Sequence, residues 1–266
     1  RSEVLDVEGE NTKIINITVE EKPTGEISAG AGFGTSGEVI EFAIKENNYL
    51  GKGLGVDTAI SLGSDKVSGK FNVTNPNFNN TDKSIRFGLE AIERDKLSAF
   101  GYKSKKIGSS IATNFEYLDD FRLGFETSAF VEKIETDSTA STRQKSQEGN
   151  YFDTYLNFDF DYDKRNQKFK TSDGFRSYYK IGLPVLSDKN TLNNYYNYKV
   201  FSELYEENIS TFALTLSSAN SITGDDIKLS ERLFVPQRKL RGFVNGKIGP
   251  KDGDDFIGGN YYALMN

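Results

Sequence analysis

The stretch "TYLNFDFDYDK", residues 154–164, alternates strictly between apolar and polar side chains. The apolar positions are Leu156, Phe158, Phe160 and Tyr162. The polar positions between them are Asn157, Asp159, Asp161 and Asp163. Successive side chains of a β-strand point to opposite faces of a sheet, so this stretch predicts a strand with one apolar face and one wet face.

The same period-two pattern recurs along most of the chain. We count about twelve such segments between Thr24 and Asn266, the last of them cut short. Apolar residues of one parity occur near positions 27–33, 40–44, 56–62, 85–89, 107–117, 121–131, 175–183 and 212–216. No stretch shows a convincing helical period, so the sequence predicts an all-β fold.

Two kinds of all-β protein fit this pattern, a transmembrane antiparallel β-barrel and a soluble sandwich or propeller. The segments approach ten residues, longer than most soluble strands, and short turns alternate with longer polar loops. Many of the 14 tyrosines and 20 phenylalanines fall near strand ends, as in aromatic girdles. The mean hydropathy of −0.55 excludes a transmembrane helix but suits barrel strands. These features favour the membrane barrel over the soluble alternative.

The composition argues against several classes of function. A net charge of −6 disfavours nucleic acid as a partner. The chain has no cysteine and no histidine, which removes thiol chemistry, the usual general base and the commonest metal ligand. Asp252, Asp254 and Asp255 lack the spacing of an EF-hand, so we interpret them as a solvated acidic loop. We therefore predict neither an enzyme nor a cofactor or metal site.

Two parts of the chain differ in pattern. Residues 1–23, which include "NTKIINITVEE", suggest a single strand closing another module, with Pro23 and Gly25 marking the break. One strand is not stable alone, so we expect the rest of that module upstream of Arg1. Residues 24–266 form the predicted barrel, interrupted by a long loop at about 221–256.

Inside that loop lies the stretch "LRGF", formed by Leu240, Arg241, Gly242 and Phe243. A solvated arginine followed by a glycine turn is the simple interpretation. However, long loops without structure of their own are usually functional or disordered, and two apolar residues flank this Arg-Gly pair. We expect the tip to pack against something, and an arginine inside a barrel lumen to seek a carboxylate.

Together with other motifs, this stretch resembles the BamA family of outer-membrane assembly factors. The family's loop motif corresponds to residues 240–243, followed by "IGP" and "GGN". Those two motifs are Ile248, Gly249 and Pro250, then Gly258, Gly259 and Asn260. "NNYLGKG" at 47–53, "VTNPNF" at 73–78 and "TSDGF" at 171–175 also match, in order and across nearly the whole chain.

The resemblance implies a barrel in the bacterial outer membrane, with residues 1–23 as the end of the last periplasmic POTRA domain. It implies a lateral seam through which unfolded β-barrel clients are folded and inserted, with assembly lipoproteins and outer-membrane lipid as the other partners. The first strand would form one side of this seam. Its residues are Glu26, Ile27, Ser28, Ala29, Gly30, Ala31, Gly32 and Phe33.

The sequence also departs from the family pattern. About twelve of sixteen strands are present, so we expect a C-terminally truncated fragment whose acidic partner for Arg241 lies just past Asn266. Two alternatives stay open. One is a related transporter for autotransporter assembly or two-partner secretion, and the other is a simple porin-like channel.

Overall fold

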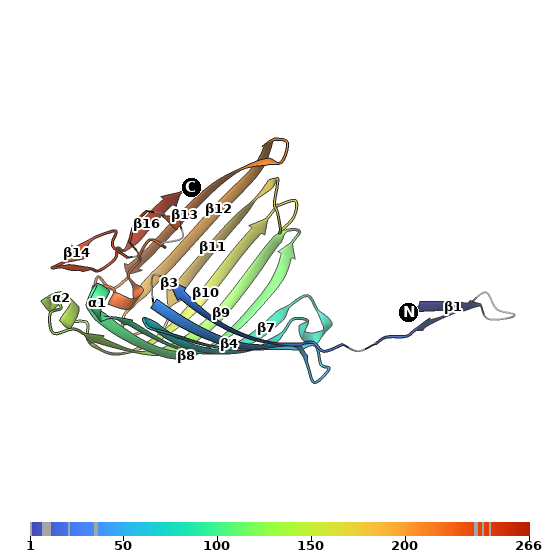
Figure 1. Cartoon of the computed structure of the whole chain (residues 1–266), viewed down its shortest axis with the longest axis horizontal. Coiled ribbons are helices and arrows are strands. Elements are labelled where there is room, and N and C mark those ends of the chain that lie inside the picture. The colour runs from blue at the N-terminus through green and yellow to red at the C-terminus, as the bar shows by residue number, and fades with distance from the viewer. Residues whose placement is uncertain are drawn as a thin grey trace.

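A computed structural model describes residues 2–6, 12–20, 22–34, 37–236, 239–240, 242–244 and 246–266 of the chain. Its main feature is a single 12-stranded antiparallel sheet in which each strand pairs with its neighbour along the chain. The sheet curves into an open trough, with β3 at one edge and β16 at the other (Figure 1). The all-β fold and the twelve strands expected from the alternation are confirmed.

The strands of the sheet are β3 (Gly25–Gly34), β4 (Gly37–Tyr49), β5 (Leu54–Gly63), β6 (Lys66–Asn75), β7 (Ser84–Lys96), β8 (Tyr102–Leu118), β9 (Phe121–Thr136), β10 (Gly149–Asp163), β11 (Gly174–Pro184), β12 (Thr191–Tyr205), β13 (Asn208–Ser221) and β16 (Tyr261–Met265). Most are ten residues or longer, because alternation continues over the whole length of each segment. A strand of about ten residues is long enough to cross a bilayer when tilted.

The two faces of the sheet have opposite chemistry. The outer face carries exposed apolar side chains in cross-strand pairs, for example Leu156 opposite Leu183. The inner face carries ion pairs, such as Arg86 with Glu126 at 2.9 Å and Arg176 with Asp161 at 2.7 Å. An apolar outer face and a charged inner face suit a barrel wall between lipid and a hydrated lumen.

The two ends of the sheet also differ. One end has tight turns, such as residues 119–120 and 206–207, and a turn containing η1 (Phe78–Asn80). The other end carries α1 (Leu97–Phe100), α2 (Thr142–Lys145) and the long loop 222–260. That loop contains η2 (Leu229–Glu231) and the hairpin of β14 (Lys251–Asp252) and β15 (Asp255–Phe256). In the described part of the chain, no helix has the length and apolarity to cross a membrane.

The N-terminal segment lies apart from the sheet (Figure 1). Here β1 (Ser2–Asp6) pairs with β2 (Lys13–Ile17) in an antiparallel hairpin. The expectation of a single strand within residues 1–23 is therefore wrong, because Ser2–Asp6 supplies a second one. Both strands expose apolar residues, for example Val4 of β1 at 57% and Ile17 of β2 at 70% exposure. A lone two-stranded hairpin is marginal in water, so the assignment of 1–23 to a larger module stays an expectation.

Candidate functional site

The long loop, residues 222–260, folds back onto the inner face of the sheet. It is fixed there by Ile227 and Leu229, which are 1% and 2% exposed. Leu229 packs in a cluster with Phe100, Tyr102 and Ile134 from α1, β8 and β9. Burial of such side chains is worth about 1.5–3 kcal/mol each, which gives the loop an apolar anchor.

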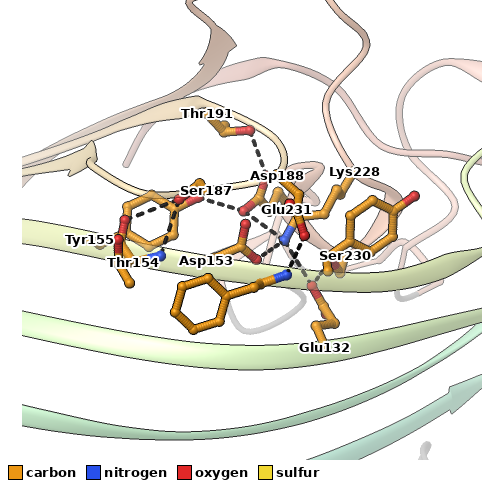
Figure 2. Close-up of polar contacts among 12 residues, drawn as sticks. Glu132, Asp153, Thr154, Tyr155, Ser187, Asp188, Thr191, Lys228, Ser230 and Glu231 are labelled. Atoms are coloured by element: carbon orange, nitrogen blue, oxygen red, sulfur yellow. Dashed lines mark hydrogen bonds and ion pairs between the residues drawn. The ribbon is translucent and has the colours of Figure 1, made fainter.

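Between these two apolar residues lies Lys228, whose side chain has no solvent exposure. Its ammonium group forms ion pairs with Glu132 Oε2 at 3.0 Å, with Asp153 Oδ2, and with Glu231 Oε1 at 3.4 Å (Figure 2). Glu132 comes from β9 and Asp153 from β10, so one loop lysine connects two adjacent strands. The ring of Tyr151 lies 5.4 Å from the same ammonium.

Glu231 is held from a third direction. Its carboxylate accepts hydrogen bonds from the Tyr155 hydroxyl at 2.7 Å and from the Thr191 hydroxyl at 2.6 Å (Figure 2). Ser230 donates to Glu132 at 3.0 Å. Residues 228–231 therefore contact β9, β10 and the start of β12 at once, which fixes the position and register of this loop segment.

The electrostatics of the cluster favour a charged lysine. Burial by itself lowers the pKa of the Lys228 ammonium, but the negative charges of Glu231, Glu132 and Asp153 outweigh it and raise that pKa above its ordinary value. One oxygen of Glu132 and one of Asp153 have no hydrogen-bond partner in the described part of the chain. Removing the lysine would leave these buried carboxylates uncompensated, at a cost of about 3–5 kcal/mol.

A second ion cluster holds the same loop at Asp226, two residues before Lys228. Here an acid is surrounded by cations, the reverse of the arrangement at Lys228. Asp226 accepts a bidentate pair from Arg143 of α2, at 2.6 and 2.9 Å, and a third bond from Arg232 at 2.5 Å. Burial raises the pKa of the Asp226 carboxyl, but Arg143 and Arg232 outweigh burial and hold it below its ordinary value. Asp226 thus lies between two arginines, and Lys228 lies between carboxylates. Because a shift of the loop by one residue would separate both sets of charges, the two clusters fix how residues 226–232 align with the sheet.

Of the expected loop motif, Arg241 lies outside the described residues. Leu240 is half-buried, and Gly242 has a positive φ of 85°, as a turn glycine does. Phe243 is 57% exposed, so the expected packing of its ring is not found within the described part of the chain. The role of residues 240–243 stays a prediction.

The two other loop motifs are brought together. The Ile257 amide donates to the Pro250 carbonyl at 3.1 Å, which closes the hairpin that joins "IGP" to "GGN". Gly259 forms a two-way backbone bridge with Leu233, at 2.8 and 2.9 Å. Gly258 has a φ of 74°, and a Cβ there would lie 2.9 Å from the Leu233 carbonyl oxygen. Only glycine allows this approach, so the motif closes the base of the loop.

The remaining expected site residues lie elsewhere. Residues Glu26 to Phe33 fall in β3, at the edge of the sheet. Asp252, from the acidic stretch, accepts a hydrogen bond from Ser141 at 2.6 Å and so helps to dock the hairpin. Within the described ranges there is no group of three or more Asp, Glu, Cys or His residues that could hold a metal ion.

Sequence reasoning missed the residues that anchor the loop. Lys228 bonds Glu132 and Asp153, which lie 96 and 75 residues earlier in the chain, and no local period links such positions. One weak signal was available. Lys228 stands between two aliphatic residues, Ile227 and Leu229, a pattern that indicates burial on both sides of the charge.

Comparison with known proteins agrees with this architecture. The model of the Omp85 superfamily domain matches residues 48–266. BamA from Haemophilus ducreyi lacking POTRA domains 1–3 superposes with a TM-score of 0.84 and 21% sequence identity, covering 99% of this chain and 56% of that chain. CdiB from Acinetobacter baumannii superposes more weakly, with a TM-score of 0.49 and 9% identity over 90% of this chain and 46% of that chain. The chain thus spans about half (56%) of the length of the BamA structure whose fold it shares.

Proposed function

The chain belongs to the Omp85 superfamily of bacterial outer-membrane β-barrel proteins, and we propose that it acts as a BamA-type assembly factor. In this role it folds and inserts other β-barrel proteins into the outer membrane. The observation that carries the proposal is a long loop docked on the inner face of a sheet whose edge strand, β3, is rich in glycine.

The edge strand supports this role because its glycines weaken its pairing with a neighbouring strand. Gly30 and Gly32 alternate along its inner face, and glycine inside a strand weakens pairing by about 0.5–1 kcal/mol per site. A weakly held edge favours exchange of partners, and an extended client segment adds to such an edge through main-chain hydrogen bonds. No bond is made or broken, so client folding supplies the energy and no cofactor takes part.

The docked loop supports the role because a wall that opens at one edge needs an internal brace. We propose that residues 222–260 brace β8 to β12 while the seam moves. Leu240, Arg241, Gly242 and Phe243 would form the tip of this brace, with Arg241 bound to a carboxylate of the barrel interior. Ile248, Gly249, Pro250, Gly258, Gly259 and Asn260 would form its base.

The organisation of the whole protein follows from the same proposal. Residues 1–23 would end the last POTRA domain on the periplasmic side, and residues 24–266 would form the N-terminal part of the barrel. The expected partners are unfolded β-barrel clients, assembly lipoproteins and outer-membrane lipid.

The test is client folding in lipid vesicles that contain the complete protein. An unfolded β-barrel client is diluted from urea, and its folding is followed by the heat-modifiable shift in gel mobility. We expect faster folding than in matched vesicles that contain a closed porin barrel. An equal rate would contradict the proposal. Translocation of an unfolded passenger, or ion conductance alone, would instead favour the transporter or the porin-like channel.

A further inference from the structure

The turn between β10 and β11, residues 164–173, presents a cationic and aromatic tip. Phe169 is 79% exposed, and both of its neighbours, Lys168 and Lys170, are exposed as well. Neither lysine forms an ion pair with any residue that the structure describes. Lys164 and Arg165 pair with Asp120 and Asp163 at the base of the turn, so among the described residues the unpaired positive charge of the turn lies at Lys168 and Lys170.

The exposed position of this tip is imposed by the turn itself. The side-chain carbonyl of Asn166 accepts backbone bonds from Gln167 at 2.9 Å and from Ser172 and Asp173 at 3.3 Å. The side-chain amide of Gln167 donates from Nε2 to the Lys170 backbone carbonyl at 2.7 Å. These bonds hold the turn in one shape, so residues 168–170 are presented outward and do not fold back onto the sheet.

A band of aromatic rings places this end of the sheet at the membrane surface. On the outer face, Tyr162 contacts Phe121 with ring centroids 6.2 Å apart and Phe175 with centroids 5.6 Å apart. Phe175 in turn lies 5.9 Å from Tyr198. Aromatic belts of barrel proteins lie at headgroup level. Tyr162 and Phe175 stand two residues before and after the turn, so the turn begins at that level.

Lysines at the same end lie over these outer rings. The ammonium of Lys83 is 5.6 Å from the ring centroid of Phe115, and that of Lys164 is 5.9 Å from the centroid of Tyr162 while it also pairs with Asp120 at 2.7 Å. Lysine side chains near the ends of membrane-spanning elements reach toward the phosphates of the headgroups. Aromatic rings and cations are therefore combined at this rim before the tip of the turn is reached.

We propose that residues 168–170 form a docking site for anionic phospholipid headgroups. The Phe169 ring enters the interfacial layer, and Lys168 and Lys170 bind lipid phosphates on either side of it. Charge complementarity and continuity with the aromatic band select lipid as the occupant, since a ring held at headgroup level meets lipid first. The site requires only a barrel in a bilayer, so it is independent of whether the protein inserts clients.

The test uses the complete protein in bilayer nanodiscs. This chain contains no tryptophan, so Phe169→Trp adds a local fluorophore that is measured as the difference from the unsubstituted protein. Its quenching by brominated phosphatidylglycerol is compared with quenching by brominated phosphatidylcholine at equal mole fraction. We expect a preference for the anionic lipid of up to about fivefold for each lysine, reduced in high salt.

Two further variants assign the effect. Lys168→Gln with Lys170→Gln in the same background is expected to remove the preference. Lys180→Gln, which removes a lysine 3.8 Å from Asp159 on the inner face, is the matched control and is expected to keep it. If Phe169→Trp does not fold, the association of spin-labelled phosphatidylglycerol with otherwise unsubstituted protein makes the same comparison.

Two results would overturn the proposal. One is equal quenching by the two lipids with both tip lysines in place. The other is quenching of the fluorophore by aqueous iodide but not by brominated lipid, which would place the tip in the aqueous phase, away from the headgroups. Client folding is not part of this measurement, so its outcome does not depend on the proposed insertion activity.

Discussion

Lys228 of the long loop and Asp153 of β10 form an ion pair in which neither side chain is exposed to solvent. The two residues lie 75 positions apart in the chain, so their contact forms only when the loop docks on the sheet. A buried ion pair adds little net stability compared with an apolar pair, but it strongly penalises any arrangement that separates the charges. The pair therefore specifies where the loop docks.

Replacing the buried lysine should release the loop. In Lys228→Met the carboxylates of Glu132 and Asp153 lose their cation, and we expect docking to weaken by about 3–5 kcal/mol. The measurement is limited proteolysis of residues 222–260 in the folded protein, with cleavage expected to be faster in the variant. Lys247→Met removes an exposed lysine from the same loop and should leave cleavage unchanged. Equal protease resistance of both variants and the parent would contradict the anchoring role.

Docking should be lost at both extremes of pH. The pKa of Asp226 is held below its ordinary value of 3.8, so its contribution is present above that pH and is lost as the pH falls through the lowered pKa. The pKa of Lys228 is raised above 10.5, so its contribution is present below that pH and is lost as the pH rises through the raised pKa. We expect constant loop protection from about pH 5 to pH 9.

The same proteolysis assay, run across pH, checks this dependence. Asp226→Asn should remove the part of the acid limb that Asp226 contributes, because an amide does not titrate there, and should leave in place the alkaline limb and the acid loss that comes from the carboxylates around Lys228. Loop protection that declines steadily through neutral pH would indicate that some other group controls docking.

The base of the loop should be sensitive to one methyl group. In Gly258→Ala the new Cβ would lie 2.9 Å from both the Leu233 carbonyl oxygen and the Phe234 ring, in a backbone with φ of 74°. Gly253→Ala has similar backbone strain, with φ of 62°, but no atom within 4 Å of the new Cβ. Left-handed strain costs roughly 1–2 kcal/mol in each, and the clash adds to it only at Gly258. Thermal unfolding should show a larger loss of stability for Gly258→Ala than for Gly253→Ala. Equal losses would show that the close approach to Leu233 does not affect stability.

The edge strand should stiffen when its glycines are replaced. A Cβ at Gly30 would meet no atom within 4 Å, and one at Gly32 would lie 3.7 Å from Val39 Cγ1, an ordinary contact, so neither position excludes a side chain at its Cβ. We expect pairing of β3 with β4 to gain about 0.5–1 kcal/mol per site, with slower amide exchange in β3 and slower client folding. Gly69→Val, equally open but in the interior strand β6, is the control. Unchanged amide exchange in β3 would show that Gly30 and Gly32 do not weaken the pairing of this strand.

Alternation allowed the fold to be predicted because it acts within each strand. Leu156 and Asp159 differ in parity, and parity alone assigns one to the lipid face and the other to the inner face. The same rule gave the strand number, since each alternating segment became one strand. It could not reveal β1, because Ser2–Asp6 is too short to show a period, nor the single-turn helix α2, which rests on a capping box between Ser141 and Gln144.

The docking site was only partly predictable. A loop cation bound to carboxylates of the inner wall was expected, but Arg241 was the expected residue, whereas the described contact is made by Lys228. The choice depends on how the loop folds over β9 and β10, and sequence near the lysine contains no information about Glu132 or Asp153. The "GGN" motif was recognised from resemblance alone, and its physical reason, the close approach of Gly258 to Leu233, needs the folded loop.

A double-mutant cycle on Lys228 and Asp153 tests the docked loop most directly. Lys228→Met, Asp153→Ala and the double variant are compared with the parent by hydrogen exchange of residues 226–232 in the complete protein. The account predicts that each single change weakens docking by about 3–5 kcal/mol and that the double change costs clearly less than their sum, because each charge is costly only when its partner is missing. Costs that simply add would contradict the account, since the two residues would then stabilise the protein independently of each other.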